Sequence, residues 1–147
     1  MSRLYPDRPV VGVGTVVWRD DRVLLIRRGR PPRAGQWSLP GGAQRLGETL
    51  REAAVREVRE ETDLALTDVR LLTTIDLVER EPDGRVRYHY TLVDFVAEAP
   101  LGEPAAGDDA EAVAWFRLDE LPSLHLWSET LRIINEAAAL RRRPPLR

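Results

Sequence analysis

One row of glutamates on the apolar side of an expected helix most constrains how this chain can fold. Residues 41–64 read GGAQRLGETLREAAVREVREETDL, and their spacing predicts a helix from about Glu48 to Glu61. At about 100° per residue, one face combines apolar residues with three acids: Leu50, Ala53, Ala54, Glu57, Glu60 and Glu61. The opposite face carries Glu52, Arg56, Arg59 and Asp63. Acids that are simply solvated would lie on this second face. The three glutamates on the apolar face are therefore expected to point toward the protein interior.

An inward-facing acid row needs a positive partner. An isolated buried charge is costly, and neighbouring carboxylates raise one another's pKa. A hard divalent cation relieves both problems, and carboxylate oxygens suit Mg²⁺ or Mn²⁺. Glu57 and Glu61, four residues apart, can bridge one cation or share two, with Glu60 beside them. The alternative is a surface helix held by ion pairs such as Arg56–Glu60, which stabilise helices modestly.

The same segment resembles the Nudix box, G-x5-E-x7-R-E-U-x-E-E-x-G-U, where U is a bulky aliphatic residue. The resemblance spans Gly42–Leu64 and holds at the chemically demanding positions: Gly42, Glu48, Arg56, Glu57, Val58, Glu60, Glu61 and Leu64. Pro40-Gly41, the aromatic Trp37 and the preceding strand pair are also similar to the family. We therefore extend the resemblance to about residues 9–140.

Asp63 departs from the motif, because it stands where the family has its last glycine. Glycine serves there because the helix ends in the left-handed conformation, which glycine adopts without strain. Asp and Asn are the commonest other residues at positive φ. We expect a modest loss of stability and an intact site.

The resemblance implies a role for each matching residue. Glu57 and Glu61 look like the main metal ligands, with Glu60 contributing or adjusting the site. The backbone carbonyl of Gly41 is the expected loop ligand, since glycine leaves the approach of a cation open. Gly42, Glu48 and Arg56 look structural, because the opposite charges of the last two could tie the loop to the helix.

The pattern of elements predicts an α/β protein. We expect strands at 9–18, 22–28, 71–78, 85–99 and 112–116, and helices at about 48–61 and 128–140. Together with the resemblance, this order implies a Nudix fold, an α/β/α sandwich with a mixed sheet. We expect a single domain over 1–147 with its core at about 9–140, and a flexible tail at 141–147.

Composition excludes several kinds of site. The chain has no cysteine and only two histidines, and its 22 basic residues are all arginine. Phosphate contacts must therefore come from arginine, backbone N–H groups or metal. A net charge of −2 argues against a nucleic-acid binder. No apolar run approaches the roughly 18 residues of a membrane span, and the first residues do not resemble a signal peptide, so we expect a cytoplasmic protein.

Hydrolysis of a phosphoanhydride also needs a general base to activate water. The resemblance allows either a box glutamate or an acid on a distal loop, and the loop GDDAEAVAW offers Asp108, Asp109 and Glu111. We favour Glu111, which comes just before the strand 112–116, and place Asp109 second. Each of these acids can equally be an ordinary part of an acidic loop.

Arginine and aromatic residues are candidates for the rest of the substrate. Arg27 and Arg28 point to opposite faces of their strand, and the family alignment favours Arg28 as the phosphate contact. Trp37, Tyr88 and Tyr90 could contact a base or sugar. For Trp37, packing in the core is the alternative.

Three functions remain open, all with a small-molecule nucleotide as the ligand. The first, which we favour, is hydrolysis of ADP-ribose to AMP and ribose 5-phosphate. The second is hydrolysis of a nucleoside triphosphate to the monophosphate and pyrophosphate. The third is a non-catalytic, nucleotide-sensing domain, which the complete acid row disfavours. The sequence leaves open whether the chain forms a homodimer.

Overall fold

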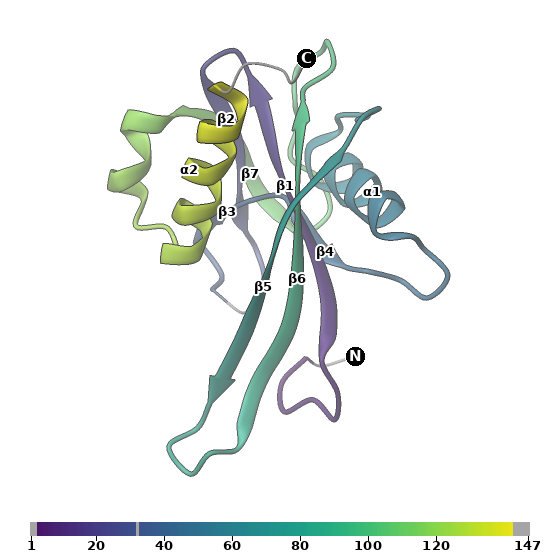
Figure 1. The fold of residues 1–147 in the computed structure, drawn as a ribbon, viewed down its shortest axis with the longest axis vertical. Coiled ribbons are helices and arrows are strands. Elements are labelled where there is room, and N and C mark those ends of the chain that lie inside the picture. The colour runs from purple at the N-terminus through teal and green to yellow at the C-terminus, as the bar shows by residue number, and fades with distance from the viewer. Residues whose placement is uncertain (1–2, 32, 143–147) are drawn as a thin grey trace.

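A mixed β-sheet lies between two α-helices in the computed structural model, which describes residues 3–31 and 33–142 (Figure 1). The elements are β1 (Val10–Arg19), β2 (Arg22–Arg28), β3 (Trp37–Ser38), β4 (Gly41–Ala43), α1 (Leu50–Thr62), β5 (Arg70–Arg80), β6 (Val86–Glu98), β7 (Ala110–Arg117), the 3₁₀ helix η1 (Leu118–Leu124) and α2 (Ser128–Arg142). The helices α1 and α2 lie on opposite sides of the sheet. The predicted α/β/α sandwich is confirmed.

β1 organises the sheet because it has three partners. It pairs in parallel with β6, and in antiparallel fashion with β2 near the turn at residues 20–21. At its other end, Gly12–Gly14 pair with β4 instead of β2. The main strand order is β3-β2-β1-β6-β5, with β7 paired to β2. This change of neighbour along β1 brings β4 beneath α1.

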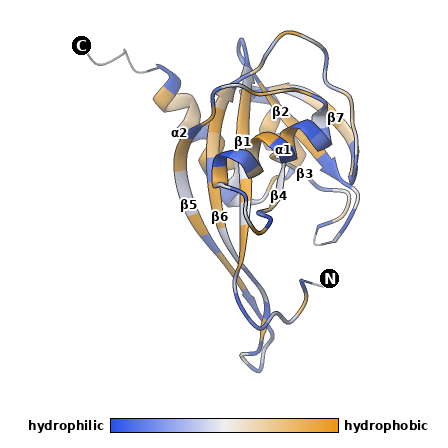
Figure 2. Ribbon diagram, turned by 90° about the vertical axis from the view of Figure 1, so that its right-hand side faces the viewer, coloured by the Kyte–Doolittle hydropathy of each residue, from blue (hydrophilic) through white to orange (hydrophobic). Residues whose placement is uncertain are grey.

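Alternation along the strands separates two hydrophobic cores. On one face, Val17, Leu24 and Phe95 pack with Ala53 and Val58 of α1. On the other face a second set packs against α2: Val16, Val23, Leu25, Ile133, Ile134 and Ala137. Figure 2 shows that α1 carries hydrophobic and hydrophilic residues on different sides. Burial of both sheet faces explains the long apolar runs in the sequence.

Several predicted boundaries change for local reasons. The helix α1 begins at Leu50, because Thr49 caps it: its hydroxyl accepts from Glu52 N–H, and the Glu52 carboxylate accepts from Thr49 N–H. The short strands β3 and β4 and the helix η1 were not predicted. The last helix runs through Arg142, so residues 141 and 142 are helical rather than tail. The prediction of flexibility for 143–147 lies outside the described residues.

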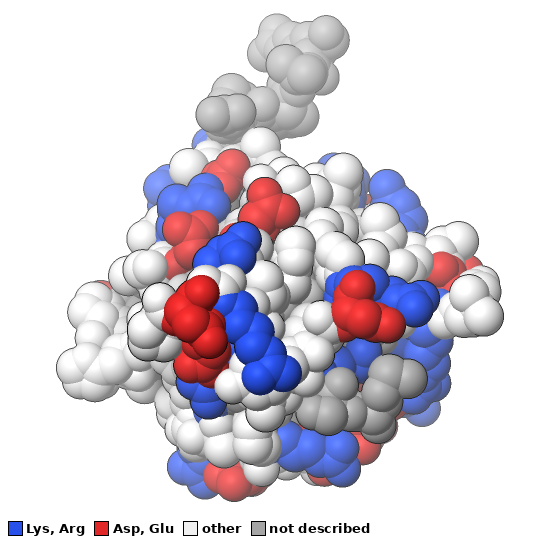
Figure 3. Space-filling model, turned by 90° about the horizontal axis from the view of Figure 1, so that it is seen from below, with Lys and Arg blue, Asp and Glu red and all other residues white. Residues whose placement is uncertain are grey.

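None of the described helices is long and apolar enough to cross a membrane. Acidic and basic side chains are interspersed on the face seen from below (Figure 3). The long β5–β6 hairpin projects beyond the body of the molecule (Figure 1).

Candidate active site

Two glutamates of α1 are buried against the sheet. Glu57 is 9% exposed and Glu61 is 6% exposed. Burial raises the pKa of both carboxyl groups, that of Glu61 to about 8. The backbone N–H of Gly41 donates to Glu61 Oε1 over 2.7 Å and opposes this rise. The predicted inward acid row is therefore real for these two residues, whereas Glu60 is only half-buried.

Glycines let β4 approach α1 this closely. A Cβ at Gly42 would lie 2.6 Å from the carboxyl carbon of Glu57. A Cβ at Gly41 would collide with the backbone carbonyl of Val13. Gly41 and Gly42 are thus required because a side chain at either position would collide with the backbone of β1 or with the Glu57 carboxylate.

Arg56 joins the loop to the acid row. Its guanidinium donates to both carboxylate oxygens of Glu48, over 2.5 and 2.9 Å, and to the carbonyl of Ala43. It also donates to Glu57 over 2.7 Å and to Glu60 over 3.2 Å. The hydrogen bonds from Arg56 hold the pKa of Glu48 at about 2. These contacts tie the loop before α1 to the helix.

The placement of Arg56 with the solvent-facing residues needs correction. Its side chain is only 16% exposed. A helical wheel records the direction of the Cα–Cβ bond, but an arginine is long enough to reach around its own helix. Arg56 therefore lies beside the acids that it seemed to oppose.

The end of α1 holds a second acidic segment in place. Asp63 caps the helix in the left-handed conformation with φ of 61°, as expected. The N–H groups of Ala105 and Gly107 donate to the carbonyls of Thr62 and Glu61, over 2.9 and 3.2 Å. Asp108 follows directly, and its charge adds to the rise in the pKa of Glu61.

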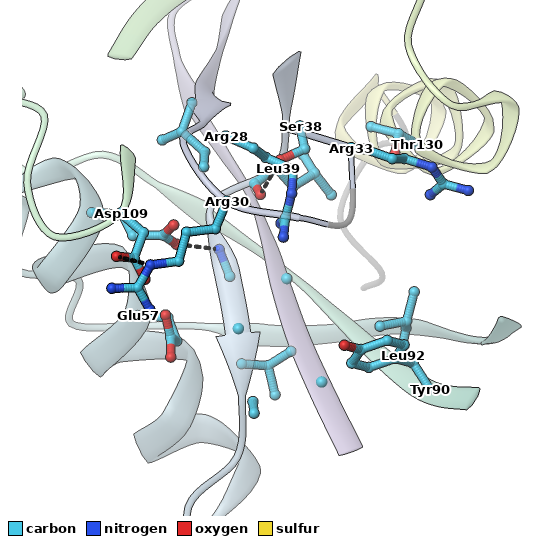
Figure 4. Close-up of a pocket in the computed structure, with 18 of the residues that line it drawn as sticks. Arg28, Arg30, Arg33, Ser38, Leu39, Glu57, Tyr90, Leu92, Asp109 and Thr130 are labelled. Atoms are coloured by element: carbon cyan, nitrogen blue, oxygen red, sulfur yellow. Dashed lines mark hydrogen bonds and ion pairs between the residues drawn. The ribbon is translucent and has the colours of Figure 1, made fainter. Parts of the chain in front are cut away.

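A cavity of about 600 Å³ extends from the acid row across the sheet. Its acidic end is lined by Glu57, Glu60, Glu61, Asp108 and Asp109, and its apolar end by Leu77, Tyr90, Leu92, Trp127 and Ile133. Figure 4 shows Glu57 and Asp109 on the opposite side of the view from Tyr90 and Leu92. Arg28, Arg30 and Arg33 line the cavity from β2 and the loop after it. The arrangement suits a ligand with a charged part and a flat or apolar part.

The structure brings some predicted residues together and leaves others aside. Arg28, Trp37 and Tyr90 line the cavity, and Trp37 also packs edge-to-face on Phe116, with ring centroids 5.0 Å apart. Tyr88 stacks on Tyr90 at 6.5 Å but is not among the lining residues.

Glu111 does not belong to the lining of this cavity either. β7 begins at Ala110, and a bulge opposite Arg27 and Arg28 contains Glu111, whose carboxylate pairs with Arg27 at 3.2 Å. The bulge changes the direction of the strand locally. The positions therefore favour Asp108 and Asp109 over Glu111 as acids near the row.

Sequence reasoning missed Asp94, a buried carboxyl group that lines the cavity from β6. Its signal was present, since one acid interrupts the apolar run LVDFV. The loop arginines Arg30 and Arg33 were also missed. Arg30 pairs with Asp109 at 2.8 Å, and Arg33 pairs with Glu79 and lies over the ring of Trp127.

The donors of the acidic end fit a hard divalent cation, although they are not arranged as a finished metal site. Within residues 3–31 and 33–142, no three acidic or histidine side chains already form a metal-binding group. Arg56 binds Glu57 and Glu60, and Gly41 binds Glu61. Still, the acidic side chains at this end all offer oxygen atoms as metal ligands. Burial also leaves the negative charges of Glu57 and Glu61 poorly compensated.

A model of the NUDIX domain matches residues 8–137. The chain belongs to the Nudix hydrolase family. It is 39% identical to an ADP-ribose pyrophosphatase of Methanocaldococcus jannaschii over 83% of this chain and 69% of the relative. It is 31% identical to an oxidized purine nucleoside triphosphate hydrolase of Danio rerio over 79% of this chain and 71% of that protein.

Solved structures agree with this assignment. A MutT NUDIX hydrolase from Burkholderia pseudomallei is 36% identical and superimposes with a TM-score of 0.77 over 88% of this chain and 98% of its own. The chain spans about half the length of several other curated relatives. Nudix hydrolases generally use divalent cations, which agrees with the oxygen donors of the acidic end.

Proposed function

We propose that this protein hydrolyses a phosphoanhydride bond in a nucleoside diphosphate joined to a second group. The observation that carries the proposal is the pair of buried carboxylates, Glu57 and Glu61, at one end of a cavity of about 600 Å³. Pockets for small ligands usually measure about 300–1,000 Å³. Buried like charges need compensation, and a cation that also binds phosphate supplies it.

We assign the metal site to Glu57 and Glu61, with Glu60 and the Gly41 carbonyl completing it and Mg²⁺ or Mn²⁺ as the cation. A cation bound there neutralises charge on phosphoryl oxygens and lowers the pKa of a coordinated water. The N–H of Gly41 orients Glu61, and Arg56 orients Glu57 and Glu60. These contacts orient the acids before substrate arrives.

The general base is assigned to an acid close to this row. Asp108 and Asp109 line the cavity, and backbone hydrogen bonds hold their loop against the end of α1. A box glutamate remains the alternative, and Glu111 is less well placed because it pairs with Arg27 outside the lining. A base must come within hydrogen-bond reach of the water that it activates.

ADP-ribose is the substrate we favour, with AMP and ribose 5-phosphate as products. The 39% identity to an ADP-ribose pyrophosphatase supports this choice. Arg28, Arg30 and Arg33 line the cavity, where guanidinium groups can bind phosphate oxygens. Tyr90 and Trp37 offer aromatic surface for a base or sugar.

Hydrolysis of a nucleoside triphosphate is the second candidate, supported by the 31% identity to an oxidized purine nucleoside triphosphate hydrolase. We also propose that the protein acts on small nucleotides rather than on nucleic acid, because its net charge is −2 and acidic and basic side chains are interspersed on the face that Figure 3 shows. The cytoplasm is the compartment that we propose for this activity.

A substrate screen with identified products tests these assignments. ADP-ribose, NADH, dinucleoside polyphosphates and nucleoside triphosphates are incubated with Mg²⁺, and matched samples contain EDTA. AMP from ADP-ribose supports the first candidate, and pyrophosphate from a triphosphate supports the second. Nucleotide binding in calorimetry without any turnover would instead indicate the non-catalytic, nucleotide-sensing domain.

A further inference from the structure

Asp94 is a buried acid that the proposed hydrolytic machinery does not use. It lies within β6, is 5% exposed and lines the cavity. It shares a strand face with Leu92 and Tyr90, two and four residues earlier, which line the apolar end. Its Oδ2 atom has no hydrogen-bond partner among the described residues. Most buried side-chain oxygens in proteins have one.

The backbone of β1 leaves room for this carboxyl group. Asp94 lies beside Gly14, which pairs in turn with Gly41 of β4. A Cβ at Gly14 would lie 2.6 Å from Asp94 Oδ1. The carboxyl group therefore occupies the space above Gly14. Gly14 is paired with Gly41, whose backbone N–H donates to Glu61.

Arg132 does not fully compensate the charge of Asp94. The charge of Arg132 acts on Asp94, but its guanidinium forms ion pairs with Glu129 at 2.6 Å and Glu136 at 3.5 Å. Burial raises the pKa of Asp94 to about 7, which indicates poor compensation of its charge. In either protonation state the group keeps an oxygen that can accept a hydrogen bond.

We propose that Asp94 is a specificity-determining residue that accepts a hydrogen bond from an N–H or O–H group on the nucleoside part of the ligand. This inference rests on the proposed function, which places a nucleoside in the same cavity. The donor is either an amino or imino group of the base or a hydroxyl group of the sugar. The apolar neighbours of Asp94 exclude competing water and make the loss of this bond costly.

Binding rather than turnover tests the inference. Dissociation constants are measured by calorimetry in the presence of Mg²⁺ for AMP, GMP, CMP, UMP and ribose 5-phosphate. The proteins are the wild type, Asp94→Leu, which removes the acceptor, and Asp94→Asn, which keeps one. Asp76→Leu is the matched control, because Asp76 is exposed on β5 and does not line the cavity.

We expect Asp94→Leu to weaken the best nucleotide by about 10–100-fold, the range of one hydrogen bond to a charged group. If the donor is on the base, Asp94→Leu should change the dissociation constant of ribose 5-phosphate by less than threefold. If the donor is on the sugar, the dissociation constants of ribose 5-phosphate and of the nucleotide should increase by the same factor. Asp94→Asn should restore part of the loss, and Asp76→Leu should bind like the wild type. Purine riboside monophosphate, which lacks the amino group, and 2′-deoxy-AMP then locate the donor.

Several results would overturn the inference. Unchanged selectivity and affinity in both Asp94 variants would show that the carboxyl group does not contact the ligand, even if the wild type hydrolyses ADP-ribose. A lower melting temperature in both variants, with normal binding by the folded fraction, would make Asp94 structural. A wild type that binds no nucleotide would refute this inference and the proposed function together.

Discussion

The buried glutamates at the acidic end of the cavity and their hydrogen-bond partners come from one stretch of sequence, whereas the apolar end is assembled from distant segments. Gly41 to Thr62 supply the buried acids, their backbone donor and the arginine that binds two of them. The apolar end combines β6 with α2 and the loop after β2. Glu57 and Glu61 each accept a hydrogen bond at the first end, whereas Oδ2 of Asp94, on the strand that carries Tyr90 and Leu92, has no hydrogen-bond partner among the described residues. The acidic end is thus prepared for one reaction, and the apolar end keeps its contacts for the ligand.

The largest effect is expected when one of the buried negative charges at the acidic end is removed. Glu57→Gln and Glu61→Gln should each lower kcat by about 10²–10⁴-fold for every substrate, because a metal-bound phosphoryl group loses several kcal/mol of stabilisation. Steady-state kinetics with Mg²⁺ measures the effect. Glu52→Gln is the control, since Gln preserves the capping box. Normal turnover in both variants would refute the metal assignment.

Two glycine substitutions should affect the two ends differently. Gly41→Ala pushes a methyl group into the backbone of β1, so it should displace the donor of Glu61 and lower kcat at least about tenfold, with a stability loss of about 1–3 kcal/mol. The methyl group of Gly12→Ala would be too close only to the flexible side chain of Leu92, 2.9 Å away, so this variant should mainly change KM. Kinetics and thermal melting of both variants test this. Equal losses of kcat in Gly41→Ala and Gly12→Ala would show that the acidic and apolar ends do not have different roles.

Aromatic surface at the apolar end should influence binding alone. Tyr90→Leu should raise KM by about tenfold, since stacking of a base on an aromatic ring contributes about 1–3 kcal/mol, while kcat stays within twofold. Tyr88→Leu is the matched control, because Tyr88 stacks on Tyr90 but is not among the lining residues. A fall in kcat for Tyr90→Leu would show that the two ends are not independent.

The buried acid should also make stability depend on pH. The pKa of Glu61 is about 8 in the folded protein, above the ordinary value of 4.5. The folded state then binds more protons between these values, so its stability falls as pH rises from about 4.5 to 8. The melting temperatures of Glu61→Gln and the wild type are compared in EDTA. The difference, variant minus wild type, should increase by about 5 °C between pH 5 and pH 8, because only the wild type loses stability by this titration. Glu103→Gln, at an exposed position, should show no such trend.

The smallest effect is expected at the end of α1. Asp63→Gly relieves left-handed strain but increases the entropy of the unfolded chain, and the exposed Arg59 pair contributes little. The free energy of unfolding should change by less than about 1 kcal/mol, and kcat should not change. Asp63→Val should be clearly less stable, because branched residues rarely adopt positive φ. A large kcat change in Asp63→Gly would show that this residue positions the acids.

Sequence could predict the acidic end because its geometry is local. Helical spacing alone places Glu57 and Glu61 on one face, and Thr49 with Glu52 defines where the helix begins. Arg56 was misplaced because a wheel ignores the reach of a long side chain.

The remaining parts of the site depend on tertiary structure. The position of Glu111 depends on a bulge between β2 and β7, which no local pattern encodes. β4 is only three residues long, and it forms where Gly12–Gly14 of β1 pair with it instead of with β2. Asp94 could be recognised as unusual in an apolar strand, but its neighbours come from β1, which lies about eighty residues earlier in the sequence.

The backbone hydrogen bonds from Ala105 and Gly107 to the last carbonyls of α1 connect two segments that are distant in sequence. When the final turn of a helix frays, the groups bound to its carbonyls are released with it. Fraying here would free the loop that carries Asp108 and Asp109 at the same moment as it loosens Glu61. Local opening of this protein should therefore disable the whole acidic end at once, instead of leaving a site with half of its carboxylates in place.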